Sequence, residues 1–294
     1  MATLRELKGR IGSVASSEKI TGAMKMISSA KMHKAELALR QLKPFRDQIE
    51  TIIANLISSD AAFSSPLMAA RPVEKMAVAV WGSDDGLCGA YNVNIFKRLL
   101  QQISLYRETL GNDAVIEILP VGSKMAKAAL KLNLPNVTVT LPADVDSKSG
   151  DTAVRDFTWR LRDAFLNGEY DRVDMVYMSF KSVSRQRLEV DRLLPVTGDA
   201  FAATASKATG RPYLFEPSAD VIFNRILPMY LLSVVQDVFT ENRASEQAAR
   251  VMAMQSANDN AQKLLEQLQL EYNKLRQAGI TTELLDIVGG QARD

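Results

Sequence analysis

Cysteine and histidine are almost missing from this sequence of 294 residues, which contains only Cys88 and His33. One cysteine cannot form an internal disulfide, so we expect a reducing compartment. These two residues also cannot supply a Cys/His zinc cluster or a mechanism that needs two histidines. We interpret Cys88 as a small packed side chain and His33 as a surface residue. The sequence predicts no catalytic, cofactor-binding or metal-binding residue.

Long apolar runs and an excess of one charge are also absent. The longest strongly apolar run, residues 226–235, has about half the length of a bilayer-spanning helix, so we do not expect it to cross a membrane. The first residues are charged and have no apolar signal core, so we expect the protein to stay in the compartment where it is made. The net charge of +2 does not indicate a protein that binds nucleic acid through its overall charge.

Charge divides the chain into three segments. Residues 1–58 hold ten basic and five acidic side chains, residues 59–217 hold nineteen of each, and residues 218–294 hold seven and ten. The apolar pattern changes at the same boundaries. We therefore predict an N-terminal helix over 1–58, a base domain over 59–217 and a C-terminal helix over 218–294, with the two helices paired.

Both end segments carry the seven-residue apolar repeat of a coiled coil. It predicts a first helix of about 55 residues, which Pro44 could kink, and a second of about 70 residues that Ser218 caps and Gly289 and Gly290 stop. The first seam is Leu7, Val14, Thr21, Ser28, Ala35, Leu42, Ile49 and Leu56, flanked by Leu4, Ile11, Phe45 and Ile52. The second is Leu227, Leu231, Val234, Val238, Ser245, Ala248 and Met252, then, after a phase shift, Leu264, Leu268, Leu275, Ala278 and Leu285.

The middle segment alternates strand and helix patterns, which is typical of a doubly wound, mostly parallel sheet. Residues 181–196 continue it as strand, turn and strand, and 59–73 and 198–211 are loops. The predicted strands are 75–81, 114–121, 136–141 and 172–180, and the predicted helices are 91–107, 122–132 and 151–167. The fold class is therefore α/β, with this central domain and a long antiparallel, left-handed two-helix coiled coil from the chain ends.

The antiparallel pairing follows from the base domain, which returns the chain to the place where it left the first helix. If Leu56 lies level with about Ser218, then Leu7 lies opposite about Gln267. Everything after about Glu271 then extends as a single helix.

Two motifs allow more than one interpretation. The loop GSDDGLCGAYN (82–92) stands where a phosphate-binding loop could lie, but Asp84 and Asp85 would repel a phosphate, so we favour a tight turn. The basic stretch 20–36, with Lys25 and Lys31, could bind nucleic acid, an anionic membrane surface or an acidic protein surface, or be a solvated coiled-coil face. It has methionines and small residues but no aromatic side chain, which favours the acidic protein surface.

Five segments, in this order, resemble the gamma subunit of F-type ATP synthases: ITGAMKMISSAKMHKAE, SDDGLCGAYN, YLFEPS, ASEQAARVMAMQSANDNA and YNKLRQAGITTELLDIVGG. The chain departs from the family at Asp85, where arginine is common, and at Gly290, where the family has alanine. The paired cysteines of the chloroplast version are absent.

The resemblance implies a non-catalytic central stalk of a bacterial ATP synthase, on the cytoplasmic face of the inner membrane. Its partners would be three alpha and three beta subunits, the epsilon and delta subunits and the c ring. It would bind no nucleic acid and meet the membrane only through the complex. By similarity, the contact residues are Met24, Lys25, Met26 and Lys31 toward the beta subunits, Arg276 and Gln277 near the tip, and Tyr213 and Glu216 near the c ring.

Two other hypotheses remain from the residues alone. One is a nucleotide-dependent α/β enzyme with helical arms, which ATP binding by the isolated chain would favour. The other is a coiled-coil scaffold that binds nucleic acid through its basic helix, which salt-sensitive DNA retention would favour.

Overall fold

The computed structural model describes residues 3–59, 64–111, 113–143, 145–201 and 215–291. The chain ends form the long helices α1 (Leu4–Ile57, 54 residues) and α6 (Ala219–Gln291, 73 residues). Pro44 lies inside α1, which continues through it. The Ser218 hydroxyl accepts a hydrogen bond from the Val221 N–H at 3.3 Å, so the predicted N-cap of α6 is confirmed.

The expected stop of the second helix at Gly289 and Gly290 is wrong, because α6 continues to Gln291. Glycine costs a helix only about 1 kcal/mol relative to alanine, so two glycines do not end a helix unless the following chain forms a competing C-cap.

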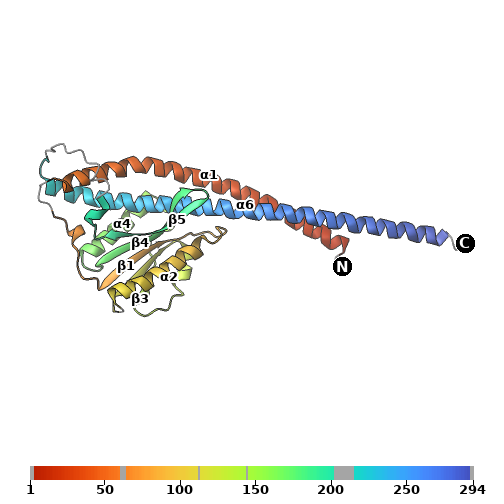
Figure 1. Cartoon of the computed structure of the whole chain (residues 1–294), viewed down its shortest axis with the longest axis horizontal. Coiled ribbons are helices and arrows are strands. Elements are labelled where there is room, and N and C mark those ends of the chain that lie inside the picture. Colours follow the sequence, from red (N-terminus) through yellow and green to blue (C-terminus); the bar gives the residue numbers. More distant parts are fainter. Residues whose placement is uncertain (1–2, 60–63, 112, 144, 202–214, 292–294) are drawn as a thin grey trace. The chain divides into compact units, whose positions relative to one another are not determined.

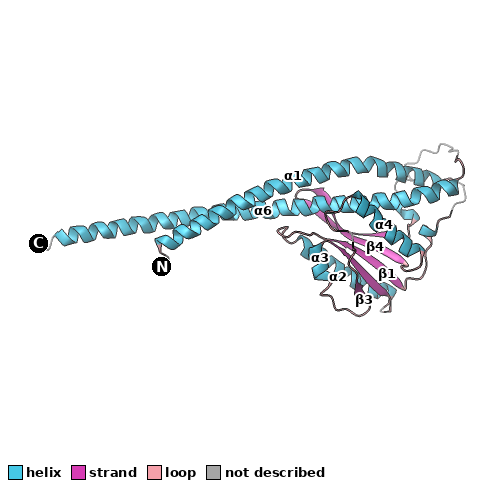
Figure 2. Ribbon diagram, turned by 180° about the vertical axis from the view of Figure 1, so that it is seen from behind, coloured by secondary structure: helices cyan, strands magenta, loops and turns pink. Residues whose placement is uncertain are grey.

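Contacts divide the chain into two compact units, one of residues 1–29 with 250–294 and one of residues 30–249. In the first unit, α1 and α6 lie side by side and run in opposite directions (Figures 1 and 2). Leu7 and Ser28 of α1 and Met254 and Leu268 of α6 are buried, and the flanking position Leu4 is exposed. The antiparallel pairing and the main seam of α1 are therefore confirmed, whereas of the flanking seam Leu4 is exposed and Ile11 is half-buried.

The seam of α6 differs from the prediction in the same unit. Met252 and Leu264 are 49% and 44% exposed, whereas Val251 and Met254 are buried. An α-helix has 3.6 residues per turn, so a strict 3.5-residue count drifts around it. The phase shift therefore comes before Met252 rather than after it.

The second unit contains a five-stranded sheet in the order β3-β2-β1-β4-β5. The first four strands are parallel to their neighbours, and β5 is antiparallel to β4, so the predicted mostly parallel sheet is confirmed. The strands are β1 (Lys75–Trp81), β2 (Val115–Val121), β3 (Val137–Val139), β4 (Arg172–Ser182) and β5 (Arg185–Leu194).

Helices cover both faces of this sheet (Figure 2). Alternate residues of β1 divide between two cores, with Val78 facing α2 and α3 and Trp81 facing α4 and α6. The Trp81 ring meets Phe157 of α4 and Phe239 of α6 edge to face, with ring centroids 6.2 and 5.5 Å away. These helices are α2 (Tyr91–Leu110), α3 (Ser123–Ala129) and α4 (Asp151–Leu166), and the short 3-10 helices are η1 (Pro66–Met68) and η2 (Gly198–Phe201).

The apolar run of residues 226–235 belongs to this core. By length and composition α6 could cross a membrane, since one stretch of it has a mean hydropathy of 1.3. However, Leu227, Leu231 and Val235 are buried in the cluster that includes Trp81. Its hydropathy is therefore explained by packing against the sheet.

The level at which α1 meets α6 in the second unit differs from the prediction. The Arg46 guanidinium contacts the Asp237 carboxylate at 2.9 Å. Counting ten residues along each helix from this contact, in opposite directions, places Leu56 nearer the level of Leu227 than that of Ser218. The reason is that the first turns of α6 pack on the sheet, and this packing sets their position along α1.

Candidate partner-binding surfaces

The four residues expected to contact a beta subunit lie on α1, on either side of its buried seam. Met26 is 67% exposed and Lys31 is exposed, whereas Met24 and Lys25 are half-buried. Buried Ser28 belongs to the seam that faces α6. At this level α1 presents Met26 and Lys31 to the solvent, while the small residue Ser28 is buried.

Small side chains bring α6 close to α1 at this level. A Cβ atom on Gly22 would lie 3.4 Å from the Asn258 side-chain nitrogen. The Asn258 amide donates to the Glu18 carbonyl at 2.8 Å and to the Thr21 hydroxyl at 3.3 Å. A single asparagine at a coiled-coil interface can determine the register of the two helices, and no sequence prediction singled out Asn258.

The same helix exposes apolar side chains that the seam does not use. Ile20 and Ile27 are 59% and 56% exposed, next to Met26. Apolar side chains gathered in this way on a surface are typical of a protein contact. The contact residues predicted by resemblance, which include Met26, did not include these two isoleucines, and neither of them lies on a predicted seam.

At the other end of the first unit, α6 extends past the beginning of α1 (Figure 1). Leu275 is half-buried, and Arg276 and Gln277, next to it, are exposed. Ile280 and Leu284 beyond them are 49% and 58% exposed. The two predicted contact residues therefore lie where α6 loses its helical partner and begins to present a mixed polar and apolar surface.

Of the two residues predicted to lie near the c ring, the structure describes only Glu216. Tyr213 lies outside the described residues. Glu216 is exposed, just before α6.

A cavity of about 540 Å³ lies in the second unit between α1, α6 and the loops of the base. Lys31 and Lys34 of α1 line it together with Lys148 and Arg243. Glu246 of α6, which is 2% exposed, is part of the same lining. Lys31 is therefore placed toward the base, apart from any role in an outward contact.

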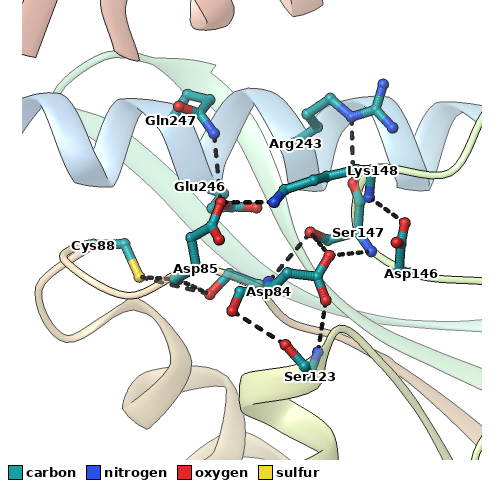
Figure 3. A network of polar contacts seen from close by, with 11 residues as sticks. Asp84, Asp85, Cys88, Ser123, Asp146, Ser147, Lys148, Arg243, Glu246 and Gln247 are labelled. Carbon is teal, nitrogen blue, oxygen red and sulfur yellow. Dashed lines mark hydrogen bonds and ion pairs between the residues drawn. The ribbon is translucent and has the colours of Figure 1, made fainter. Parts of the chain in front are cut away.

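The loop after β1 forms the centre of a polar network beside this cavity (Figure 3). The Asp84 carboxylate accepts hydrogen bonds from the Ser123 N–H at 2.7 Å and from the Ser147 hydroxyl at 2.7 Å and N–H at 3.0 Å. Burial acts to raise the pKa of Asp84, but these hydrogen bonds outweigh it and hold the pKa below its ordinary value. The carboxylate therefore takes the place at the start of α3 where a phosphate would bind.

Arg243 of α6 joins the same network (Figure 3). Its guanidinium donates to the carbonyls of Ser147 at 3.3 Å and Ser149 at 2.9 Å. Asp85 forms an ion pair with Lys148 at 2.9 Å, which raises the pKa of Lys148. The departure from the family at Asp85 thus has a partner within this chain.

Asn242, the buried residue that precedes Arg243, also fixes α6 to the base. Asn242 is 1% exposed, accepts a hydrogen bond from the Tyr91 hydroxyl at 2.6 Å and donates to the Gly82 carbonyl at 3.1 Å. Tyr91 opens α2 and Gly82 directly follows β1, so one side chain of α6 is joined to the start of α2 and to the loop after β1. No sequence pattern singled out Asn242.

Arg46 connects the two long helices in the second unit. It bonds to Glu50 of its own helix at 2.7 Å and to Asp237 of α6 at 2.9 Å. Burial raises the pKa of Asp237, against the opposing effect of Arg46. Within the described ranges, no group of three or more His, Cys, Asp or Glu side chains could hold a metal ion.

Together, the fold and these surfaces define a protein whose two terminal helices pair and whose α/β base holds one of them by polar and apolar contacts. A family described as ATP synthase matches residues 3–292. The ATP synthase gamma chain of Bacteroides fragilis is 40% identical over 294 residues, covering 99% of each chain. That of Acinetobacter baylyi is 35% identical over 301 residues, again covering 99% of each. The chain belongs to the ATP synthase gamma-chain family.

Solved structures share the fold. A chain in the Euglena gracilis mitochondrial ATP synthase assembly of OSCP, F1 and c ring has a TM-score of 0.64 at 20% identity, over 98% of this chain and 93% of that one. A chain of the Tetrahymena thermophila central stalk and c-ring structure has a TM-score of 0.57 at 23% identity, over 81% and 99%.

Proposed function

We propose that this chain is the central rotary stalk of a bacterial F-type ATP synthase, and that it performs no catalysis itself. Its partners are three alpha and three beta subunits, the epsilon and delta subunits and the c ring, on the cytoplasmic face of the inner membrane. Residues 1–58 and 218–294 form the shaft and residues 59–217 form the base. The chain meets the membrane only through the complex.

One observation carries the proposal: α6 is a continuous helix from Ala219 to Gln291 whose base portion is held by buried contacts. Asn242 bonds to Gly82, directly after β1, Arg243 bonds to the loop at 147–149, and Phe239 packs on Trp81. A torque applied to the base therefore acts directly on α6. A loop lying on the surface of the base, without such buried contacts, would not transmit the torque in this way.

The catalytic sites would belong to the beta subunits, and this chain would act on them by differential contact. An asymmetric shaft favours a different conformation in each subunit it touches, and turning it shifts those preferences in sequence. Met24, Lys25, Met26 and Lys31 of α1 and Arg276 and Gln277 of α6 are the proposed contacts with the surrounding subunits. Tyr213 and Glu216 are the proposed contacts with the c ring.

The test is a rotation assay on the assembled complex. Lys127 is exposed on α3, so a Lys127→Cys variant in a Cys88→Ser background accepts a thiol-linked bead on the base. With the alpha and beta subunits immobilised, ATP should turn the bead in one direction. A bead that stays still on a complex that hydrolyses ATP and contains this chain would contradict the proposal.

A nucleotide-dependent enzyme is the competing function, and the isolated chain tests it. Because Asp84 binds the Ser123 N–H at the start of α3, a phosphate would meet a carboxylate there. Calorimetric titration with Mg-ATP is expected to show no saturable binding in the micromolar range. A micromolar site would favour the enzyme.

A further inference from the structure

An arginine pocket, of about 330 Å³, opens at the sheet between α2 and β5, in the second unit and apart from the surfaces described above. Three guanidinium groups line it, those of Arg98 on α2, Arg172 on β4 and Arg192 on β5. A ligand bound in this pocket would be separate from the proposed rotary function, and the inference does not depend on that function.

One of the three arginines is already neutralised. Arg172 bonds to Asp174 through two nitrogens, at 2.9 and 2.7 Å, and the Tyr106 hydroxyl also donates to that carboxylate. Asp174 is 1% exposed, so it lies on the floor of the pocket. Burial and the nearby Asp174 charge raise the pKa of Tyr106, which stays protonated as a donor.

The other two arginines have no such partner. Arg192 lies directly opposite Asp174 in the β4–β5 register, yet Asp174 is occupied by Arg172 and Tyr106. Among the residues that the structure describes, neither Arg98 nor Arg192 has a carboxylate within ion-pair distance. The pocket therefore contains two guanidinium groups, that of exposed Arg192 and that of half-buried Arg98, without an ion-pair partner among the described residues.

The lining also indicates the kind of anion. Gln102 and Thr197 are the other polar residues of the lining, and Val190 is its apolar residue. A nucleobase would need an apolar or aromatic surface, which this lining lacks. Several guanidinium donors around a small volume match an ion with many acceptor oxygens.

We propose that Arg98, Arg172 and Arg192 form a binding site for a phosphate group. Arg98 and Arg192 would donate to its oxygens from α2 and β5, while Arg172, held by Asp174, would supply a fixed third guanidinium. The phosphate is either free inorganic phosphate or the headgroup phosphate of an anionic lipid, since both present the same oxygens to the pocket.

The test compares two double variants of the full chain that lose the same charge. Arg98→Gln with Arg192→Gln removes the uncompensated pair. Lys97→Gln with Arg185→Gln removes exposed neighbours on the same two elements. Calorimetric titration with inorganic phosphate at constant ionic strength should show one site on the wild type, weakened at least tenfold in the first variant and less than twofold in the second.

Absence of saturable binding by the wild type, or equal weakening in both variants, would overturn the proposal. So would displacement of phosphate by acetate at equal concentration, which would mean a carboxylate site. A second measurement uses the wild type alone: phosphate should slow phenylglyoxal modification of Arg98 and Arg192 but not of Arg185. Equal modification rates with and without phosphate would also overturn it.

Vesicles separate the two sources of phosphate. If the pocket takes a lipid headgroup, the wild type should bind vesicles of phosphatidic acid but not of phosphatidylcholine, and the Arg98→Gln, Arg192→Gln variant should lose that binding. If the variant and the wild type bind the vesicles equally while phosphate titration still separates them, the ligand is free phosphate.

Discussion

The Asp84 carboxylate connects separate parts of the base, because it accepts hydrogen bonds from Ser123 and Ser147. Asp84→Ala should lower the free energy of unfolding by about 1–3 kcal/mol, since it leaves these donors without an acceptor. Asp85→Ala is the control and should cost less than about 1 kcal/mol, because its ion pair with Lys148 is exposed on both sides. Urea unfolding at pH 7 measures both, and equal losses would contradict the assignment.

The lowered pKa of Asp84 also predicts how the stability of the chain depends on pH. The pKa of Asp84 in the folded chain lies below its ordinary value of 3.8. Its contribution to stability is therefore complete above that value and is lost as the pH falls through the lower, folded pKa. The difference in unfolding free energy between the wild type and Asp84→Ala should be constant from about pH 7 to about pH 5 and shrink below the ordinary value of 3.8. A difference that grew on acidification would have the wrong sign.

Two glycines of the same loop should respond differently to a β-branched side chain. Gly89 has a φ of +60°, whereas Gly86 has no positive φ and a Cβ there would have its nearest neighbour, on Lys124, at 3.8 Å. Gly89→Val should therefore destabilise the chain by about 1–3 kcal/mol and Gly86→Val by less. Thermal unfolding of the two variants gives the comparison, and a larger effect at Gly86 would refute it.

For the long helices, the contact of Asn258 with Glu18 and Thr21 sets the level at which α1 meets α6 in the first unit. In a Cys88→Ser background, Thr21→Cys with Asn258→Cys should be joined efficiently by a short thiol cross-linker. Thr21→Cys with Asn273→Cys is the control, because residue 273 lies about 22 Å further along the helix. Mass spectrometry of the digested chain identifies the bridge. Preferential cross-linking of the control pair would mean a different register.

For the whole molecule, the proposed contact at Arg276 and Gln277 depends on the assembled complex. Replacing both by alanine should leave helicity and the thermal midpoint of the isolated chain unchanged, because both are exposed. ATP hydrolysis and synthesis by the complex should fall markedly, since charge-assisted bonds of about 1.5–3 kcal/mol each would be lost.

The matched control for that variant is Gln262→Ala with Lys263→Ala, an exposed glutamine and basic residue elsewhere on α6. It should leave turnover near the wild-type value. Unchanged turnover in a fully assembled Arg276→Ala, Gln277→Ala complex would remove these residues from the coupling contacts.

Much of the architecture is local, and the sequence by itself determined it. The β1 bounds match the predicted 75–81, and Ser218 caps α6 as expected, because alternation and capping depend on neighbours along the chain. The seam of α1 at Leu7, Ser28 and Ile49 is buried, because the seven-residue period follows one face of a helix. The contact surfaces at Met26 and Arg276 were found by resemblance, and their function stays a prediction.

Only the tertiary structure decided what meets that seam. Phe45 and Ile52, predicted to flank it, are 48% and 40% exposed, and the Arg46–Asp237 contact places Leu56 nearer Leu227 than Ser218. A heptad pattern is satisfied by many registers, whereas α6 must also place Phe239 on Trp81 and Asn242 between Tyr91 and Gly82. Those partners lie far apart in sequence, so the level of the helices, the polar network and the arginine pocket exist only once the sheet brings them together.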